Sequence, residues 1–262
     1  HITYRPLTIV RCPSGREECF YQKNLTEELP PFLKGVLIPS KDEAQTYIMI
    51  EDLPGLIALV QIGVLEIHPW PSRSNRLEYP DRMIFDMDPD PAVSPGVLAE
   101  GCLLLRDLLQ ALGLRSFLKT TGGKGFHLVV PIMPENHWQE VKEFAKAVAE
   151  SLVKSYPRRF VATMSKTKRK DKIFVDYFRN HWEATAVAPY STRARAGAPV
   201  STPLGWEELS DNLKPDSFTI ENLPIRLSSL SLDPWGEFFN IRQSLSEIVK
   251  KETIARGPVG KK

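Results

Sequence analysis

The sequence predicts an α/β fold in which mixed sheets are flanked by helices, because short apolar runs alternate with segments of helical period along most of the chain. Of the 262 residues, 42% are hydrophobic and 25% are charged, which is the composition of a folded protein. The segment 137–154 has the clearest helical period, with its apolar and charged side chains on opposite faces. Its apolar face consists of Val141, Phe144, Ala145, Val148 and Leu152. We expect this helix to cover a sheet.

The other elements follow from the same patterns. The expected strands are 47–50, 82–85, 116–119, 126–131 and 172–177. The expected helices are 53–62, 95–112, 137–154 and 237–250. Prolines recur from Ala184 onward, so this last part is expected to be extended and to wrap around the core. The prolines on either side of a polar loop, at 69–71 and 79–80, indicate a boundary near residue 80.

Composition excludes several classes of protein. The 34 Lys and Arg residues nearly balance the 32 Asp and Glu residues, so the chain is neither a histone-like polycation nor an acidic solvating chain. Any contact with nucleic acid must therefore come from a local basic patch. No apolar run approaches the ~20 residues that a membrane helix needs, so no membrane segment is expected.

The cysteines and the chain ends give weaker indications. Cys12, Cys19 and Cys102 cannot pair completely and lack the spacing of a zinc site, which favours a reducing, cytoplasmic compartment. Position 1 is His and no signal peptide follows, so we expect a domain boundary there, and residues 257–262 are interpreted as a linker or tail. Both a module of a longer chain and a free-standing protein of this size stay open.

Two carboxylates close the apolar run that precedes Pro89. Because side chains alternate along a strand, Asp86 and Asp88 are expected to point to the same side. Two acids on one face repel each other unless a cation lies between them, and Mg²⁺ and Mn²⁺ prefer such oxygen ligands. The alternative is an acidic turn that caps the segment that follows.

A third carboxylate, Asp176, interrupts an apolar run that ought to be buried on at least one side. Burial of a carboxylate without a partner is costly. Asp176 is therefore expected either to form a salt bridge with a nearby arginine, such as Arg179, or to complete a three-carboxylate site with Asp86 and Asp88. Three acids on neighbouring strands that hold two divalent ions ~3.5–4 Å apart are used for in-line phosphoryl transfer.

The stretch 119–127 is rich in glycine and lies between two expected strands. Glycines such as Gly122 and Gly123 let the backbone approach a ligand closely and turn its N–H groups inward. Donors are added by Thr121, Lys124 and His127. The stretch therefore predicts a cradle for phosphate oxygens, with a flexible hairpin turn as the alternative. It is not a Walker A loop, because a strand and not a helix follows the lysine.

Basic residues precede the strand that carries Asp176. They include Lys166, Lys168, Arg169 and Lys170. Such a run is usually a solvated loop, but its position beside a candidate metal ligand makes contact with a phosphate backbone equally plausible. Further along, Arg193 and Arg195 share one face of an extended segment and are expected to contact phosphates.

Three further candidates rest on weaker patterns. His68 stands just ahead of a proline, where a lone histidine is more often structural. Lys23 and Phe32 lie in short aromatic and apolar stretches, 20–23 and 32–33, that usually belong to a core. In a protein that binds nucleic acid, Phe32 would stack on a base and Lys23 would reach a phosphate.

These motifs together resemble the polymerase domain of bacterial DNA ligase D and its free-standing relatives, which belong to the archaeo-eukaryotic primase superfamily. The resemblance runs from about Phe20 to Glu208 and rests on blocks that occur in the order of the family. The blocks are 68–70, 85–89, 119–127, 175–180 and 184–191, and 195–203 continues the match. The resemblance implies a primase-like catalytic core around a central cleft.

The resemblance also implies roles for individual residues. Asp86, Asp88 and Asp176 would bind two catalytic divalent ions, either Mn²⁺ or Mg²⁺. The glycine-rich block, together with Arg193, would bind the triphosphate of the incoming nucleotide, and His68 would be an active-site residue. Lys23 falls in a stretch that resembles the part recognising the 5′-phosphate of a broken DNA end.

The function implied by the resemblance is template-dependent addition of nucleotides to gapped or overhanging, 5′-phosphorylated DNA ends in non-homologous end joining. It implies a preference for ribonucleotides, Ku and a DNA ligase as partners, and a cytoplasmic, nucleoid-associated location. We expect one compact domain, with DNA-end contacts in 1–80, the catalytic core in 81–200 and a wrapping segment and tail in 201–262.

Three alternatives remain at this point. The first is a primase that starts chains de novo, and the second is a non-catalytic module that binds DNA ends through its basic stretch. The third is a phosphohydrolase that uses the same three acids. The sequence leaves the choice between ribo- and deoxyribonucleotides, the identity of the metal and the oligomeric state open.

Overall fold

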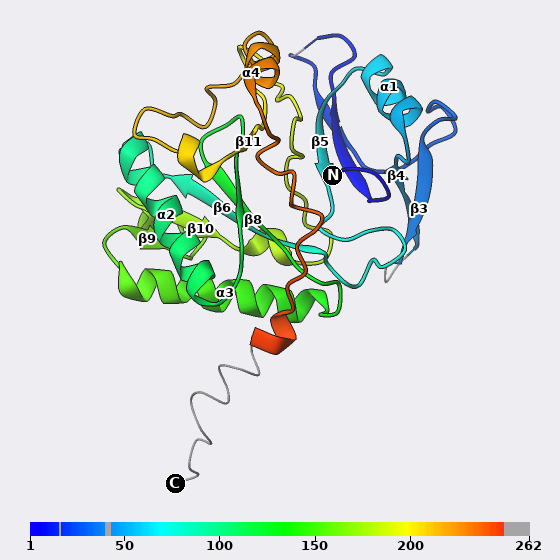
Figure 1. Ribbon diagram of the computed structural model, residues 1–262. Coiled ribbons are helices and arrows are strands. Elements are labelled where there is room, and N and C mark those ends of the chain that lie inside the picture. Colours follow the sequence, from blue (N-terminus) through cyan, green and yellow to red (C-terminus); the bar gives the residue numbers. More distant parts are fainter. Residues whose placement is uncertain (16, 40–42, 249–262) are drawn as a thin grey trace.

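The computed structural model describes residues 1–15, 17–39 and 43–248, which contain two β-sheets. The strands of the first sheet are β1 (Leu7–Arg11), β2 (Phe20–Gln22), β3 (Lys34–Ile38), β4 (Gln45–Met49) and β5 (Val64–Pro69). Helix α1 (Leu53–Gln61) packs its buried face on this sheet, and Figure 1 shows both on one side of the molecule. The Asp52 side chain accepts the N–H of Gly55 and begins the helix.

The second sheet has the strand order β11-β7-β8-β6-β10-β9. Its strands are β6 (Arg82–Pro89), β7 (Phe117–Thr120), β8 (Phe126–Pro131), β9 (Phe160–Val161), β10 (Ile173–Asp176) and β11 (Pro203–Leu204). All neighbouring strands in it are antiparallel except β9 and β10. Strand β6 therefore lies in the interior of the sheet, between β8 and β10.

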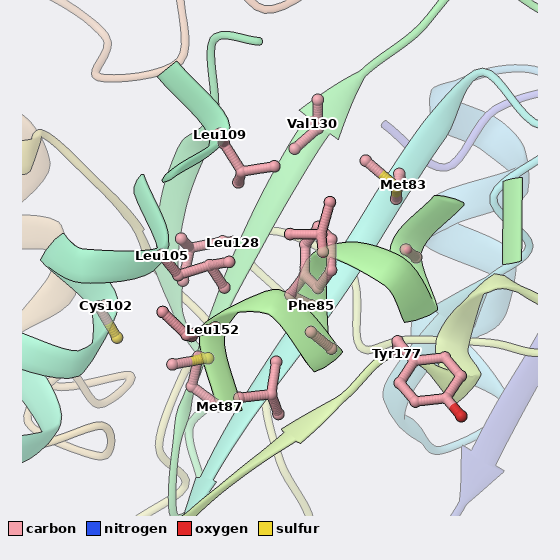
Figure 2. Close-up of a cluster of buried hydrophobic side chains, with 14 of the residues drawn as sticks. Met83, Phe85, Met87, Cys102, Leu105, Leu109, Leu128, Val130, Leu152 and Tyr177 are labelled. Carbon is pink, nitrogen blue, oxygen red and sulfur yellow. The ribbon is translucent and has the colours of Figure 1, made fainter. Parts of the chain in front are cut away.

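Helices α2 (Pro95–Ala111) and α3 (Trp138–Ser155) cover one face of the second sheet (Figure 1). On that face, Met83, Phe85 and Met87 of β6 pack with apolar side chains of both helices (Figure 2). These are alternate residues of one strand, so Asp86, which lies between two of them, and Asp88, which follows Met87, point to the opposite face. The core thus fixes which face of β6 carries the acids.

The three predicted helices that end before residue 160 are confirmed, with ends that differ by one residue at most. The helix predicted at 237–250 is wrong in its first part. Residues 234–240 form turns, because Trp235 and Phe238 stack on each other and are buried with Ile84 and Phe117 on the outer face of the sheet. Residues 245–248 are helical, and the remainder of the predicted helix lies outside the described residues.

All five predicted strands are present, and β6 continues through Asp88 to Pro89. Strands β1, β2, β3, β5, β9 and β11 were not predicted. In the described residues after Ala184 the chain has little regular structure, as expected, apart from β11, a short 3₁₀ helix (Trp206–Glu208), helix α4 (Leu223–Ser229) and the helical residues 245–248. The predicted tail at 257–262 lies outside the described residues. No helix in the described ranges has the length and apolar character needed to cross a membrane.

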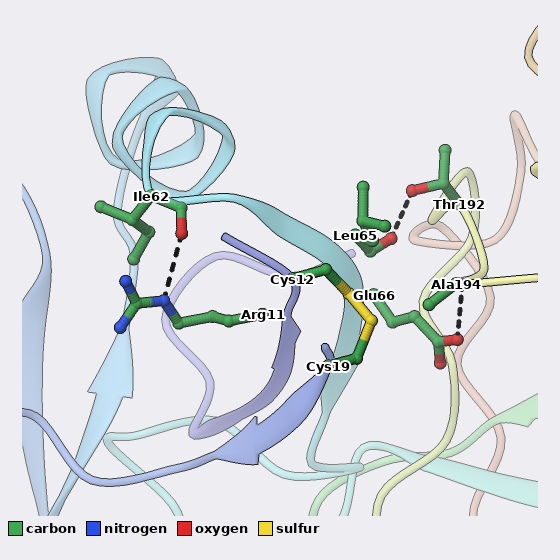
Figure 3. Close-up of a disulfide and its surroundings, with 8 residues drawn as sticks. All are labelled: Arg11, Cys12, Cys19, Ile62, Leu65, Glu66, Thr192 and Ala194. Atoms are coloured by element: carbon green, nitrogen blue, oxygen red, sulfur yellow. Dashed lines mark hydrogen bonds between the residues drawn. A yellow bond between two sulfur atoms is a disulfide. The ribbon is translucent and has the colours of Figure 1, made fainter. Parts of the chain in front are cut away.

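A disulfide joins Cys12 and Cys19 across the connection between β1 and β2 (Figure 3). The cysteine spacing did not predict this pairing, because the hairpin that brings the two residues together could not be recognised from short, irregular strands. The hairpin register is also held by the side chains of Arg11 and Gln22, which form a hydrogen bond of 2.9 Å. Cys102, the remaining cysteine, is buried with a free thiol.

Reduction of the Cys12–Cys19 disulfide is expected to lower the free energy of unfolding by about 2 kcal/mol or less, because the loop that it closes is short. Urea unfolding with and without a thiol reductant measures this difference. The double variant Cys12→Ser/Cys19→Ser is the control and should show no response to reductant. An equal midpoint for the wild-type protein under both conditions would contradict the pairing.

Candidate active site

The register of β6 against its two neighbours, β8 and β10, brings titratable side chains from distant parts of the chain together. Asp86 pairs directly with Asp176 on β10 and with His127 on β8, and His127 in turn pairs with Lys119 on β7. Directly opposite residues in a sheet place their side chains on the same face, about 4.5–5.5 Å apart at Cβ. Four strands therefore present one row of charged or titratable groups on the face opposite the helices.

The structure shows the salt bridge between Asp176 and Arg179 that was one of the two alternatives for this acid. Asp176 faces Asp86, and the guanidinium of Arg179 lies between them. Its Nη2 atom donates to Asp86 Oδ2 at 3.0 Å, and its Nε atom lies 3.5 Å from Asp176 Oδ2. Arg179 belongs to a 3₁₀ turn (Phe178–Asn180) that directly follows β10, and Asn180 fixes this turn through hydrogen bonds with the backbone of Ile84.

The acids have unequal charge environments. Burial alone would raise the pKa of Asp86, but His127 and Arg179 outweigh it and hold that pKa below its ordinary value. Burial, followed by the negative charge of Asp86, raises the pKa of Asp88 to about 6. Burial also raises the pKa of Asp176, against the opposing effect of Arg179. One arginine thus neutralises the three acids only in part.

The donor set suits a hard divalent cation, since it consists of carboxylate oxygens that are close together and incompletely neutralised. The raised pKa of Asp88 is the observation that favours such an ion, because a bound cation would restore the charged form. Within the described ranges, no group of three or more His, Cys, Asp or Glu residues is already spaced to hold a metal. Arg179 occupies the space between two of the candidate ligands.

Two basic groups of the row are buried beside the acids. Burial, with the charge of Lys119 added, lowers the pKa of His127 to about 4, so its imidazole is neutral at pH 7. Burial likewise lowers the pKa of Lys119 well below its ordinary value. His127 Nε2 lies 3.4 Å from Asp86 Oδ2, and its buried Nδ1 atom has no hydrogen-bond partner among the described residues.

A pocket of about 470 Å³ opens over this row. It is lined by most of the residues that the sequence singled out for catalysis and nucleotide binding. These are His68, Asp86, Asp88, Thr121, Gly123, Lys124, His127 and Arg193. The pocket is also lined by Arg179, Arg195 and Tyr21, and by residues 185–187.

The glycine-rich loop differs in detail from the predicted phosphate cradle. The backbone N–H groups of its three glycines are bonded within the protein. The N–H of Gly122 donates to the carbonyl of Pro215, and the N–H groups of Gly123 and Gly125 donate to the hydroxyl of Thr121. Gly122 does not line the pocket and has a φ of +62°, which favours glycine. A Cβ at Gly125 would lie 2.1 Å from the carbonyl oxygen of Met87. Gly125 therefore allows the close approach of the loop to β6, and Gly122 allows the turn of the backbone.

Arg193 and His68 reach the pocket from outside the second sheet. Arg193 Nη1 donates to the carbonyl of Thr121 at 2.8 Å, which ties the arginine to the glycine-rich loop. His68 lies on β5, the strand of the first sheet that continues toward the pocket. Burial lowers the pKa of His68, so it is uncharged at neutral pH.

The candidate DNA-binding residues do not line the pocket. Lys23 is half exposed, with Nζ 3.4 Å from Glu183 Oε2, and Phe32 is exposed. The basic run forms a 3₁₀ helix (Lys166–Arg169) followed by Lys170. Arg169 packs on the ring of Phe174 and is near enough to lower the pKa of both Asp88 and Asp176.

Sequence reasoning passed over Tyr21, Glu66 and Lys119. The stretch 20–23 was interpreted as core, yet Tyr21 is 73% exposed. Two adjacent aromatic residues in a strand face opposite sides, so one of them had to point away from a one-sided core. Glu66 and Lys119 are both buried charged residues in apolar strands. Like Asp176, each of them is a charged side chain whose burial without a partner would be costly.

The fold and the pocket together define a nucleotidyltransferase core of the archaeo-eukaryotic primase type, a class that generally depends on divalent metal. The family described as LigD, primase-polymerase domain, matches residues 1–235, and the chain belongs to this family. The resemblance that the motifs indicated, and the α/β fold with a primase-like core, are thereby confirmed.

Individual relatives agree with this assignment. The chain is 40% identical over 257 residues to the multifunctional non-homologous end joining protein LigD of Pseudomonas aeruginosa, covering 97% of this chain and 30% of that protein. It is 29% identical over 237 residues to the bifunctional non-homologous end joining protein LigD of Bacillus subtilis, covering 90% of this chain and 38% of that protein. The chain thus spans about a third of the length of these curated relatives.

A solved structure, the polymerase domain of Mycobacterium tuberculosis ligase D in complex with DNA, superposes with a TM-score of 0.82 at 32% identity. The alignment covers 87% of this chain and 82% of that chain. These relatives favour neither a primase acting de novo nor a non-catalytic DNA-end binding module.

The Asp88→Asn variant is expected to be more stable than the wild-type protein above pH 6, by on the order of 1–2 kcal/mol without metal. The pKa of Asp88 is raised from 3.8 to about 6 on folding, so its ionisation costs stability as pH rises through that interval, and asparagine cannot ionise. Urea unfolding at pH 4 and pH 7.5 checks the sign. At pH 4 the two proteins should be nearly equal, and a gain that is independent of pH would contradict the interpretation.

Replacement of Arg179 by glutamine is expected to lower stability without metal by about 1–2 kcal/mol and to enlarge the rise in thermal midpoint caused by Mn²⁺. The reason is that guanidinium and metal ion compete for Asp86 and Asp176. Arg226→Gln is the matched control, since Arg226 pairs with Glu208 away from the pocket. If Mn²⁺ shifts both variants and the wild type equally, no such competition exists.

Proposed function

We propose that the chain is a template-dependent polymerase that fills gaps and extends DNA ends in non-homologous end joining. The observation that carries the proposal is that Asp86 and Asp88 line the pocket edged by the glycine-rich loop, while Asp176, which does not line it, lies directly opposite Asp86 on the neighbouring strand. Membership of the LigD primase-polymerase family supports it.

Two divalent ions, Mn²⁺ or Mg²⁺, held by Asp86, Asp88 and Asp176, would activate the 3′-hydroxyl of the primer and stabilise charge on the phosphates. The chain itself positions the incoming triphosphate. Lys124 and Arg193 supply positive charge toward the leaving pyrophosphate, whereas His127 is neutral and contributes a hydrogen bond. Arg179 must leave the space between the acids, and its side chain then becomes available to phosphate oxygens.

The nucleotide-binding residues divide into two kinds of contact. Lys124, His127 and Arg193 offer side-chain donors, while Thr121 and Gly123 shape the loop that carries Lys124. Gly122 acts through its backbone conformation. His68 extends from the first sheet and lines the pocket beside Arg193, since both contact Glu66. A nucleoside triphosphate, either ribo- or deoxyribo-, is the substrate, and the resemblance favours ribonucleotides.

DNA contacts belong to the surface around the pocket. The residues proposed for them are Lys23, Phe32, Lys166, Lys168, Arg169 and Lys170. The exposed ring of Tyr21 adds a surface on which a base can stack. The structure of a related polymerase domain in complex with DNA supports DNA as the ligand. The ends bound would be gapped or overhanging and would carry a 5′-phosphate, with contacts in 1–80, catalysis in 81–200 and support from 201–262.

Ku and a DNA ligase are the proposed partners, because the related proteins are named for non-homologous end joining and are about three times longer than this chain. We place the activity in the cytoplasm, at the nucleoid, where its DNA substrate lies. In that reducing compartment, cellular thiols would reduce part of the Cys12–Cys19 disulfide to two free thiols.

Asp86→Ala and Asp176→Ala are each expected to reduce nucleotide addition by at least about a hundredfold while leaving DNA binding within a fewfold of wild type. The reason is that the acids would hold the metal ions needed for nucleotide addition, whereas the basic surface would supply the affinity for DNA. Extension of a gapped, 5′-phosphorylated duplex with Mn²⁺ or Mg²⁺, and with ribo- or deoxyribonucleotides, measures the first quantity. Gel shift measures the second.

The matched control is Asp171→Ala, which removes an exposed acid just before β10 that lies outside the pocket. It should extend primers as the wild type does. Full extension by Asp86→Ala or Asp176→Ala would refute the metal assignment. Product from two free nucleotides on an unprimed template would instead support a primase.

A further inference from the structure

We propose that Glu66 is a positioning residue for nucleotide binding, which holds His68 and Arg193 in place on the wall of the pocket through a single buried carboxylate. This inference rests on the proposed function, because it assigns Arg193 to the incoming triphosphate. Glu66 does not line the pocket itself and would act only through its neighbours.

The contacts of Glu66 use both carboxylate oxygens. Oε2 lies 2.8 Å from His68 Nε2 and 3.0 Å from Arg193 Nε. Oε1 accepts the backbone N–H of Ala194 at 2.9 Å (Figure 3). The side chain of Glu66 is 6% exposed, so these partners replace water almost completely. The carboxylate therefore ties together the two pocket residues and the backbone next to one of them.

The backbone of β5 on both sides of Glu66 is also hydrogen-bonded to the segment that carries Arg193. The Leu65 carbonyl accepts the Thr192 hydroxyl, and the Ile67 N–H donates to Ser191 Oγ at 2.9 Å. The segment 188–194 thus lies along β5, a strand of the first sheet, while Arg193 reaches the glycine-rich loop of the second sheet. Glu66 holds the root of the guanidinium at Nε, and Thr121 holds its end at Nη1.

Charge explains why a carboxylate is needed at this position. The charged groups that face His68 are Glu66, Arg193 and the buried Lys119. Both basic groups lower the pKa of His68, and Glu66 opposes them. The pKa of Glu66 is itself lowered to about 2, against its burial, by His68, the Ala194 N–H and Arg193. The carboxylate is therefore ionised at any working pH and fixes Arg193 before a nucleotide arrives.

The test compares Glu66→Gln with Glu66→Asp and with a matched control. Glu208 also pairs with an arginine, Arg226, and accepts a backbone N–H, that of Gly205, but it lies away from the pocket. Glu208→Gln therefore removes a similar set of contacts without touching His68 or Arg193. All variants are first checked by thermal unfolding, so that binding is compared between folded proteins.

The measured quantities are the Kd for GTP with Mn²⁺, obtained by calorimetry, and the imidazole pKa of His68, obtained by NMR titration. Glu66→Gln is expected to weaken GTP binding at least about tenfold and to lower the pKa of His68, because the negative charge is lost. Glu66→Asp keeps the charge and should fall between Glu66→Gln and the wild type. Glu208→Gln should match the wild type in both quantities.

A folded Glu66→Gln protein that binds GTP within twofold of the wild type, with an unchanged titration of His68, would overturn the proposal. If Glu66→Gln does not fold, Glu66→Asp decides: an unchanged Kd overturns the proposal, and a raised Kd supports it. Neither readout requires turnover. A wild-type protein that binds GTP but never extends a primer would refute the polymerase function and leave the role of Glu66 standing.

Discussion

The antiparallel register of β6 between β8 and β10 is the constraint on which the rest of the site depends. It sets Asp86 opposite both His127 and Asp176, from segments that are far apart along the chain. The period of a strand is two residues, so the same register that buries Met83, Phe85 and Met87 under the helices turns the acids to the pocket. A slip of one residue would exchange the two faces, and the hydrophobic core therefore protects the placement of the acids.

This placement concentrates negative charge where water is scarce. The acids repel one another, and the sheet tolerates them because Arg179 and His127 lie within reach. The compensation is incomplete at Asp88, where burial and the charge of Asp86 raise the pKa of the carboxyl group to about 6. The pocket lining also includes the basic side chains of Lys124, Arg193 and Arg195, and Arg193 pairs with the buried carboxylate of Glu66 behind it. Acidic and basic side chains thus line one pocket, the combination that transfer of a phosphoryl group with its metal ions requires.

Local patterns predicted the fold class, the main helices and the three acids, because each depends on residues adjacent in sequence. Asp86 and Asp88 follow from alternation, and Asp176 follows from an acid in an apolar strand. The direction of the Gly122 N–H could not be predicted, since its acceptor is the distant Pro215. The error in the first part of the helix predicted at 237–250 has the same cause: Phe238, together with Trp235, packs against Ile84 and Phe117 of the sheet. What local sequence lacks is the pairing between remote segments.

The long separation between β6 and β10 also bears on how the protein is made. Arg179 meets Asp86 across 93 residues, so during translation β6 and β8 are complete long before their third partner leaves the ribosome. Until β10 arrives, the nascent sheet has an open edge along β6 that carries unpaired backbone groups. The same pairing that closes this edge brings Asp176 and Arg179 to Asp86, so a chain that ends before residue 173 would lack both side chains and would leave the edge of β6 unpaired.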